Sequence, residues 1–220
     1  MKRSANRRAR LSEARLYFVT EAATDPVLLE AALEGGVDML QLRDPVADDD
    51  EILAAAALFR ALCDEHNALF WVNDRPDLAL RAGADGVHLG QDDMQVSAAR
   101  ELVGQALLIG LSTHSADQLA AGVAAGADQL SVGPVWETPT KPGRPAAGLD
   151  YVRHAARVDP PVPWFAIGGI DEHNVQEVVA AGAGRAVVVR AVRDAPDPRL
   201  AAAGLRSALI KGRSTVGTAQ

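Results

Sequence analysis

Three charged side chains follow short apolar runs and have the chemistry to hold a phosphate and a metal ion. Arg43 ends the run MLQLR, Asp74 follows LFWVN, and Asp93 follows GVHLGQD. Two carboxylates can share one hard cation that keeps several of its waters. A planar guanidinium holds phosphate oxygens through paired hydrogen bonds. These residues indicate a metal-assisted phosphate site, with two alternatives left open: a buried ion pair of Arg43 with Asp74, or Asp74 as a helix cap.

A loop and a pair of glycines add further groups that can bind an anion. Residues 138–143 (TPTKPG) offer two hydroxyls and the ammonium of Lys141 on a stretch that proline and glycine keep out of helix. This composition is typical of a lid over an anionic ligand. Gly168 and Gly169 precede a helix expected near Asn174, where backbone N–H groups can cradle a phosphate. A tight turn is the alternative for the two glycines.

The histidines indicate neither nucleophilic nor zinc chemistry. His114 follows Ser112 where a strand is expected to give way to a helix, so it either contacts a ligand or packs at the helix start. We expect His88 to be a barrel histidine with its hydrogen bonds satisfied. No Ser, His and Asp set stands at suitable positions and no His and Cys cluster is present, so acyl transfer and zinc chemistry are not indicated.

A repeat in the sequence indicates how many strands and helices position these groups. In each copy an alanine-rich helix ends at glycine and a short, mostly apolar run follows. The copies are residues 34–42, 81–89, 124–132 and 180–188. Their equivalent glycines, 47, 43 and 56 residues apart, are Gly36, Gly83, Gly126 and Gly182. Glycine suits the left-handed residue that closes a helix, and each interval has room for two β/α units.

Filling these intervals gives eight strands that alternate with eight helices. The strands are expected near residues 15–20, 39–43, 69–73, 86–89, 107–112, 129–133, 163–167 and 186–190. The helices are expected near residues 26–34, 49–65, 76–81, 96–102, 116–125, 150–158, 174–181 and 198–209. The pattern predicts an α/β fold, a single-domain (β/α)8 TIM barrel, because a doubly wound sheet would have fewer strands and a GxGxxG loop. Chemistry in this fold sits at the carboxyl ends of the strands, where the groups above fall.

Composition and charge agree with one such domain. With 220 residues, 48% hydrophobic and 4% aromatic, the chain has the content of packed helix and parallel-sheet layers. The net charge is −7, although the first ten residues hold five basic side chains and no acid. The rest of the chain has 17 basic and 29 acidic side chains. Its net negative charge repels nucleic acid, so we expect no nucleic-acid partner.

We expect residues 1–13 to be a disordered basic tail, residues 14–211 the barrel and residues 212–220 a flexible C-terminal tail. A targeting signal is the alternative for the basic tail, although it lacks an apolar segment. Cys63 is the only cysteine, which excludes an intramolecular disulfide and suits a reducing compartment. No apolar run reaches the roughly 18 residues of a membrane helix. We therefore expect a soluble, cytoplasmic protein with no membrane partner.

Six motifs, in this order, resemble the thiamine phosphate synthase family over residues 15–209. They are QLRD at 41–44, VND at 72–74, HLGQDD at 88–93, GLSTH at 110–114, TPTKPG at 138–143 and AIGGI at 166–170. The resemblance implies a transferase of thiamine biosynthesis with two small-molecule substrates. It would join 4-amino-2-methyl-5-(diphosphooxymethyl)pyrimidine to a thiazole phosphate, giving thiamine monophosphate and diphosphate.

The resemblance also implies a role for each matching residue. The pyrimidine and its diphosphate would be held by Gln41, Arg43, Asn73, Ser112 and Lys141. Of these, Arg43, Ser112 and Lys141 would be catalytic, and Mg2+ would be bound by Asp74 and Asp93. The thiazole phosphate would be held by Thr138, Thr140, Gly169 and the backbone at Val189 and Arg190.

The family's chemistry is dissociative. Diphosphate leaves, the electron-rich aminopyrimidine supports the resulting methylene cation, and the thiazole nitrogen captures it. No protein nucleophile is required, so catalysis would consist of stabilising the leaving diphosphate and holding the two rings in line.

Two positions depart from the family pattern. Pro45 stands where the family commonly has lysine, which removes one cation from the diphosphate site, and Arg190 stands where the strand-eight motif often ends in serine. Our hypothesis is that Arg190 partly offsets the missing lysine. Two alternatives are a thiazole tautomerase relative, against which the retained metal and diphosphate residues argue, and a noncatalytic regulator that binds thiamine precursors. The oligomeric state stays open, a homo-oligomer included.

Overall fold

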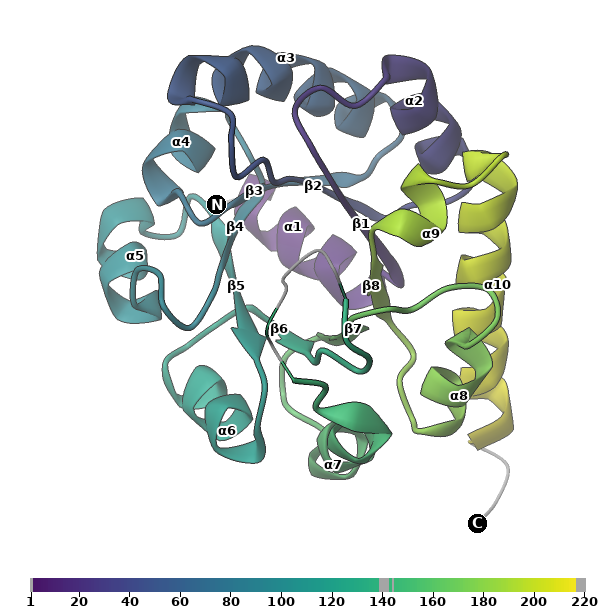
Figure 1. Ribbon diagram of the computed structural model, residues 1–220. Helices are drawn as coiled ribbons and strands as arrows, with labels where there is room; N and C mark the ends of the chain where they lie inside the picture. The colour runs from purple at the N-terminus through teal and green to yellow at the C-terminus, as the bar shows by residue number, and fades with distance from the viewer. Residues whose placement is uncertain (1, 139–142, 144, 217–220) are drawn as a thin grey trace.

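Eight parallel strands close into a barrel with helices around it (Figure 1). The structure, a computed structural model, describes residues 2–138, 143 and 145–216, with the backbone alone at residues 2–5 and 212–216. The strands are β1 (Leu16–Thr20), β2 (Met39–Leu42), β3 (Leu69–Asn73), β4 (Gly86–Leu89), β5 (Leu108–Thr113), β6 (Gln129–Val132), β7 (Trp164–Ile167) and β8 (Ala186–Val188). Each strand pairs with its neighbours in sequence, and β8 pairs with β1. The predicted (β/α)8 TIM barrel is confirmed.

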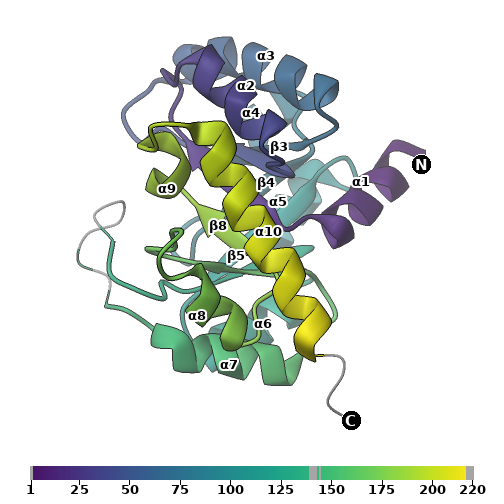
Figure 2. The same cartoon turned by 90° about the vertical axis from the view of Figure 1, so that its right-hand side faces the viewer.

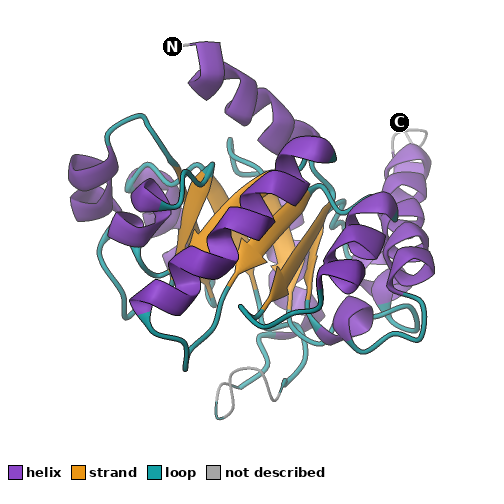
Figure 3. Cartoon of the chain, turned by 90° about the horizontal axis from the view of Figure 1, so that it is seen from above, coloured by secondary structure: helices purple, strands orange, loops and turns teal. Residues whose placement is uncertain are grey.

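The helices surround the strands, as the view from above shows (Figure 3). They are α1 (Lys2–Glu13), α2 (Pro26–Glu34), α3 (Asp49–Glu65), α4 (Pro76–Arg81), α5 (Val96–Val103), α6 (Ala116–Ala124), α7 (Gly148–Val158), α8 (Val175–Ala180), α9 (Arg190–Arg193) and α10 (Pro198–Val216). Local sequence fixes several starts: α3 begins with a capping box, in which Asp48 and Glu51 bind each other's backbone N–H groups. Apart from α10, the predicted helices agree with the structure to within two residues.

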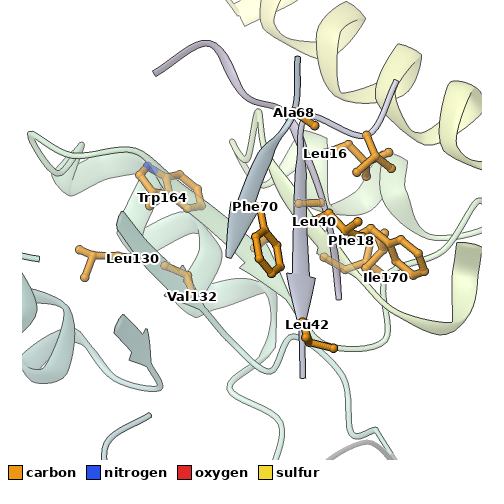
Figure 4. Close-up of a cluster of buried hydrophobic side chains, with 14 of the residues drawn as sticks. Leu16, Phe18, Leu40, Leu42, Ala68, Phe70, Leu130, Val132, Trp164 and Ile170 are labelled. Atoms are coloured by element: carbon orange, nitrogen blue, oxygen red, sulfur yellow. The ribbon is translucent and has the colours of Figure 1, made fainter. Parts of the chain in front are cut away.

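Apolar side chains fill two separate layers, one outside the barrel and one inside it. Phe18, Leu40 and Phe70 belong to the outer layer, between the strands and the helices (Figure 4). Tyr17 and Trp71, each one position away along the same strands, belong to the inner layer. Successive strand residues point to opposite faces of the sheet. Polar residues that share the inner alternation therefore point toward the barrel axis.

Helix α1 closes the amino end of the barrel. Its residues belong to the segment 1–13, for which the sequence predicts a disordered tail. Figure 2 shows α1 at the end of the barrel opposite to α9. Leu11 of this helix is 2% exposed and belongs to the inner apolar layer. Arg7 and Arg8 pair with Asp85 and Asp128 at 2.7 and 2.8 Å. The structure thus differs from the predicted tail, because contacts with the barrel stabilise a basic segment that has no apolar run of its own.

Three aspartates of the sequence repeat have one structural role at this amino end. The carboxylates of Asp38, Asp85 and Asp128 accept the N–H of the first or second residue of β1, β3 and β5, at 3.0, 3.0 and 2.9 Å. Each also pairs with an arginine, respectively Arg206, Arg60 and Arg100. The acid that follows the glycine in these copies of the repeat therefore joins a strand to its neighbour and to a helix.

Two chain segments end differently from the prediction. Strand β8 stops at Val188, and Arg190 begins the short helix α9 instead of ending the strand. Helix α10 continues to Val216, into the residues predicted as a flexible C-terminal tail. Within the described ranges, none of the helices has both the length and the apolar character needed to cross a membrane.

Candidate active site at the carboxyl ends of the strands

A cavity of about 440 Å³ opens at the carboxyl ends of the strands, and every strand contributes to its lining. Eight of the residues predicted to bind substrate line this cavity: Gln41, Arg43, Asn73, Ser112, Thr138, Gly169, Val189 and Arg190. The predicted residues Thr140 and Lys141 lie outside the described residues. Most of the predicted substrate groups therefore face one common space.

A smaller cavity of about 160 Å³ adjoins the main one between the loops that follow β2 and β3. Asp74 and Pro45 line it, and Arg43 and Asn73 line both cavities. Asp93 lines neither of these two cavities. Of the residues predicted for diphosphate and metal, Arg43 and Asn73 thus line both cavities and Asp74 the smaller one, while Asp93 lies outside both.

Arg43 has a buried guanidinium N–H group that no other described residue binds. Its Nε is buried and has no hydrogen-bond partner among the described residues. The backbone N–H of Arg43 donates to the carbonyl of Thr20 at 2.8 Å, which fixes the chain at the end of β2. In the part of the chain that the structure describes, Arg43 forms no ion pair, so the alternative of a buried pair with Asp74 is not found. A buried unpartnered N–H group is costly unless a ligand satisfies it.

Gln41 precedes Arg43 by two residues and so points to the same face of β2. It is 3% exposed, and its Nε2 donates to the hydroxyl of Tyr17. Burial raises the pKa of Tyr17, against the opposing effect of the hydrogen bond from Gln41. Tyr17 therefore stays a neutral phenol at the floor of the cavity. Tyr17 could not be recognised as a site residue from the sequence, because an aromatic residue in a strand is typical of core.

Asp74 occupies a sharp turn directly after β3. Its φ is +60°, its N–H donates to the carbonyl of His88 at 2.8 Å, and the N–H of Arg75 donates to the carbonyl of Asn73 at 2.7 Å. Aspartate tolerates this left-handed conformation better than most residues. The residue that caps α4 is Arg75, so the alternative of Asp74 as the helix cap is wrong.

Asp93 follows the adjacent strand β4, and its Oδ2 accepts the N–H of Gly90 at 2.7 Å. Asn73 and His88, at the ends of β3 and β4, are register partners, so both aspartates follow neighbouring strands. Across residues 2–138, 143 and 145–216, no group of three or more His, Cys, Asp or Glu side chains could hold a metal. Mg2+ does not need such a group. It is usually bound by one or two carboxylates, and waters and the phosphate of the substrate complete its coordination, so the pair Asp74 and Asp93 fits Mg2+.

His88 and Ser112 are joined inside the cavity. His88 Nε2 lies 2.9 Å from Ser112 Oγ, and His88 Nδ1 lies 3.2 Å from Gln129 Oε1. The prediction that His88 is a satisfied barrel histidine is confirmed. Gln129 and its partner Ser131, 3.1 Å away, were not singled out from the sequence. Their signal was two polar residues at alternate positions of the strand QLSV.

His114 lines the cavity but does not cap the following helix. Its Nδ1 lies 2.5 Å from the carbonyl oxygen of Gly133, and its backbone N–H donates to Gln118. The residue that caps α6 is Ser115. Of the two alternatives for His114, its place in the cavity wall favours contact with a ligand.

Gly168 and Gly169 turn the chain after β7 in left-handed conformations that favour glycine. Their φ values are +107° and +69°, and a Cβ at Gly168 would lie 2.5 Å from Pro134. Asn174 donates its Nδ2 to the carbonyl of Gly169 at 2.7 Å. Gly169 lines the cavity, and as a glycine it has only backbone atoms to present there.

An arginine, buried hydroxyls and glycine turns around one cavity at the carboxyl ends of a (β/α)8 barrel define an enzyme that handles phosphorylated small molecules. Residues 16–192 match the family model for thiamine monophosphate synthase. The chain belongs to the thiamine monophosphate synthase family.

Individual relatives agree with this assignment. A thiamine-phosphate synthase of Thermobifida fusca is 53% identical over 208 residues, which cover 92% of this chain and 95% of the relative. One from Acidothermus cellulolyticus is 51% identical over 201 residues, covering 89% and 95%. The structure of a thiamine phosphate pyrophosphorylase from Pyrococcus furiosus superposes with a TM-score of 0.83 at 33% identity, covering 93% of this chain and 98% of that one. The predicted family and transferase class are confirmed, and the tautomerase and regulator alternatives are not favoured.

Proposed function

We propose that the chain is a thiamine-phosphate synthase that joins an aminopyrimidine methyl diphosphate to a thiazole phosphate and releases diphosphate. The observation that carries this proposal is the cavity in which Gln41, Asn73 and Ser112 gather beside Arg43, whose Nε has no partner among the described residues. It offers neutral hydrogen-bonding groups for a ring, and a half-buried cation with a buried N–H group for a diphosphate. Family membership supports the same reaction.

Arg43 is proposed to bind the diphosphate and to stabilise its charge as it leaves. The buried Nε of Arg43 would donate to a phosphate oxygen, and a charge-assisted hydrogen bond of this kind is about twice as strong as a neutral one. Lys141, which lies outside the described residues, is proposed to add a second cation. Both charges oppose the negative charge that grows on the leaving group in the transition state.

Asp74 and Asp93 are proposed to hold Mg2+. The two carboxylates follow adjacent strands, and Asp74 lines the smaller cavity next to Arg43. When bound, Mg2+ would neutralise charge on the diphosphate and so favour its departure. The two carboxylates supply the negative charge that a cation needs beside the cationic Arg43.

The opposite wall of the cavity is proposed to hold the thiazole phosphate. Its proposed contacts are Thr138, Thr140, the backbone of Gly169 and Val189, and Arg190. The glycine turn supports this, because it leaves the Gly169 backbone open to the cavity. With the two phosphates on different walls, the two rings would meet in the middle of the cavity.

The protein groups in the cavity favour a dissociative reaction. Ser112, Gln41 and the neutral Tyr17 surround the expected pyrimidine site, and Gln41 and Tyr17 bind each other. Ser112 contacts His88, but the other ring nitrogen of His88 faces the amide of Gln129 and not a carboxylate, so the acid of a Ser, His and Asp set is replaced by a neutral group. Diphosphate would leave, the aminopyrimidine would support a methylene cation, and the thiazole nitrogen would form the new C–N bond. The protein's contribution is alignment and electrostatic stabilisation.

Diphosphate release from the two purified substrates tests the proposal. We expect release that depends on both substrates and on Mg2+, and that falls strongly in Arg43→Gln but not in Arg153→Gln, which removes an exposed cation of α7. Conversion of the thiazole substrate alone would support the tautomerase alternative. Binding of both substrates without any release would support the regulator alternative.

Because the family's substrates are small molecules, we propose small-molecule partners only, with no nucleic acid and no membrane. A cytoplasmic location fits a biosynthetic enzyme with a single buried cysteine. A homo-oligomer remains an open part of the proposal, which sedimentation of the purified chain would decide.

A further inference from the structure

Four polar side chains form a continuous hydrogen-bonded row across strands β4, β5 and β6. The row runs from Ser112 to His88, Gln129 and Ser131, with separations of 2.9, 3.2 and 3.1 Å. Their exposures are 9%, 6%, 0% and 1%, so all four are buried. We call these four residues the buried row. Ser112, His88 and Ser131 line the main cavity, and Gln129 lies behind them.

Gly110 is the residue that lets the row cross strand β5. His88 and Gln129 are both register partners of Gly110, one on each side. A Cβ at Gly110 would lie 2.5 Å from Gln129 Oε1 and 2.6 Å from His88 Nδ1. The contact between the ring and the amide therefore occupies the space that a side chain would otherwise fill. The contact can form only because β5 lies between β4 and β6 and has glycine at the matching position.

The row has a direction that follows from donor and acceptor chemistry. An amide oxygen only accepts, so His88 Nδ1 must carry the proton that points to Gln129 Oε1. In a neutral ring with this tautomer, Nε2 has a lone pair and accepts the hydroxyl proton of Ser112. The Ser112 oxygen keeps its lone pairs for a ligand in the cavity.

Reversal of the amide would reverse the whole row. The amide nitrogen of Gln129 would then donate to His88 Nδ1, and the ring would donate from Nε2 to Ser112. The hydroxyl proton of Ser112 would become available to a ligand. In the structure Gln129 Nε2 donates to Ser131 Oγ while Oε1 faces His88 Nδ1, so the amide has the first orientation and Ser131 acts as its acceptor.

We propose that His88, Gln129 and Ser131 are positioning residues that hold Ser112 as a hydrogen-bond acceptor, so that the cavity selects a ring bearing an N–H donor over one bearing an acceptor. The identification of that donor with the amino group of the aminopyrimidine rests on the proposed function. The protonation of the His88 ring does not rest on it, so the two can be tested separately.

The protonation of the ring can be read directly by 15N NMR of the histidine-labelled protein, with the His88 signals assigned through His88→Asn. We expect the proton on Nδ1 in the unchanged protein and a shift toward Nε2 in Gln129→Met and in Ser131→Ala. The matched control is Tyr151→Phe, which removes a buried hydrogen bond of 2.7 Å to Thr113 and should leave the ring unchanged. A proton on Nε2, or on both nitrogens, in the unchanged protein overturns the proposal, as does an unaltered ring in both variants.

Kinetics of the two substrates supply a second readout that a merely structural role would not move. We expect Gln129→Met to raise KM for the pyrimidine diphosphate about three- to tenfold, the effect of one net hydrogen bond, and to leave KM for the thiazole phosphate unchanged. Ser131→Ala, a smaller change, should act in the same direction. Equal changes for both substrates, or changes no larger than those of Tyr151→Phe, would overturn the proposal. If the unchanged protein releases no diphosphate, the proposed function fails while the ring measurement still decides the row.

Discussion

Arg7 of helix α1 and Asp85 at the start of β4 form an ion pair of 2.7 Å, although 78 residues separate them in the sequence. Asp85 is 5% exposed, and its carboxylate also accepts Arg60 of α3 at 2.7 Å and the N–H of Phe70 at 3.0 Å. A single carboxylate thus joins two helices to the amino end of the barrel.

Substitution of this carboxylate should destabilise the fold. We expect Asp85→Asn to lower the free energy of unfolding by about 3 kcal/mol, because it leaves two largely buried guanidinium groups without their counter-charge. Urea unfolding followed by circular dichroism measures this change. The control is Asp77→Asn, which breaks an exposed ion pair with Arg75 and should cost less than about 1 kcal/mol. Equal losses in the two variants would contradict this account.

The same carboxylate should make stability depend on pH. Burial acts to raise the pKa of Asp85, but the hydrogen bonds from Arg60, Phe70 and Arg7 and the charge of Arg60 outweigh it, so the pKa lies below its ordinary value. Its stabilising effect is therefore complete above the ordinary aspartate pKa of about 4 and is lost as the pH falls through the lower value of the folded state. We expect the free energy of unfolding to fall less steeply with acid in Asp85→Asn than in the unchanged chain. Parallel curves for the two proteins would refute this.

The barrel could be predicted from the sequence because its signals are local. Glycine-closed helices and apolar runs recur at intervals that suit two β/α units, and they need no knowledge of distant contacts. Helix α1 could not be predicted in this way. Its arginines find their partners 78 and 120 residues away, and only the closed barrel brings those partners to one end.

In the candidate site, too, the features set by local sequence could be predicted and those set by distant contacts could not. Gln41, Arg43 and Ser112 could be placed because strand alternation fixes the face on which each side chain lies. The contact between His88 and Gln129 could not be predicted, since it depends on an intervening strand with glycine at the matching register position. Arg190 was placed one element too early, because the strand ends two residues before it.

Filling the space at Gly110 should separate the ring of His88 from the amide of Gln129. We expect Gly110→Ala to cost about 1–3 kcal/mol of stability through overpacking and to raise KM for the pyrimidine substrate. The matched control is Gly204→Ala in α10, where an added Cβ meets no atom within 4 Å. Alanine is the better helix former, so this control should be neutral or stabilise by up to about 1 kcal/mol. Thermal unfolding together with steady-state kinetics distinguishes the two variants, and a Gly110→Ala protein with unchanged KM would argue against a role of this contact in binding.

Loss of either proposed metal ligand should raise the requirement for Mg2+. For Asp74→Asn and Asp93→Asn we expect the Mg2+ concentration for half-maximal rate to rise about tenfold or more. Mutation of a residue that only hydrogen-bonds to a metal ligand already lowers metal affinity about tenfold, so loss of a ligand should cost at least as much. Asparagine at position 93 keeps an oxygen that can accept the N–H of Gly90, so the loop should retain its contact. Diphosphate release titrated with Mg2+ measures the effect, and Asp77→Asn serves as the control. Unchanged titrations in both variants would remove these residues as ligands.

Pro45 and Arg190 provide a test of compensation within the site. Pro45 lines the smaller cavity and Arg190 the main one, while Arg43 lines both, so a cation added at position 45 would join the diphosphate groups. We expect Pro45→Lys to lower KM for the pyrimidine diphosphate about three- to tenfold, the effect of one further hydrogen bond to a charged group at a solvent-accessible position. Arg190→Ala should raise the KM of at least one phosphorylated substrate by a similar factor.

The double variant Pro45→Lys/Arg190→Ala decides whether Arg190 offsets the missing lysine. If the two cations serve the same phosphate charge, the loss caused by Arg190→Ala should be smaller when Lys is present at position 45, because residues that share a partner are not additive. Steady-state kinetics of the four proteins give this coupling directly. Strictly additive changes would mean that Arg190 acts on a different group, and unchanged KM and kcat in Arg190→Ala would mean that its side chain has no part in the reaction.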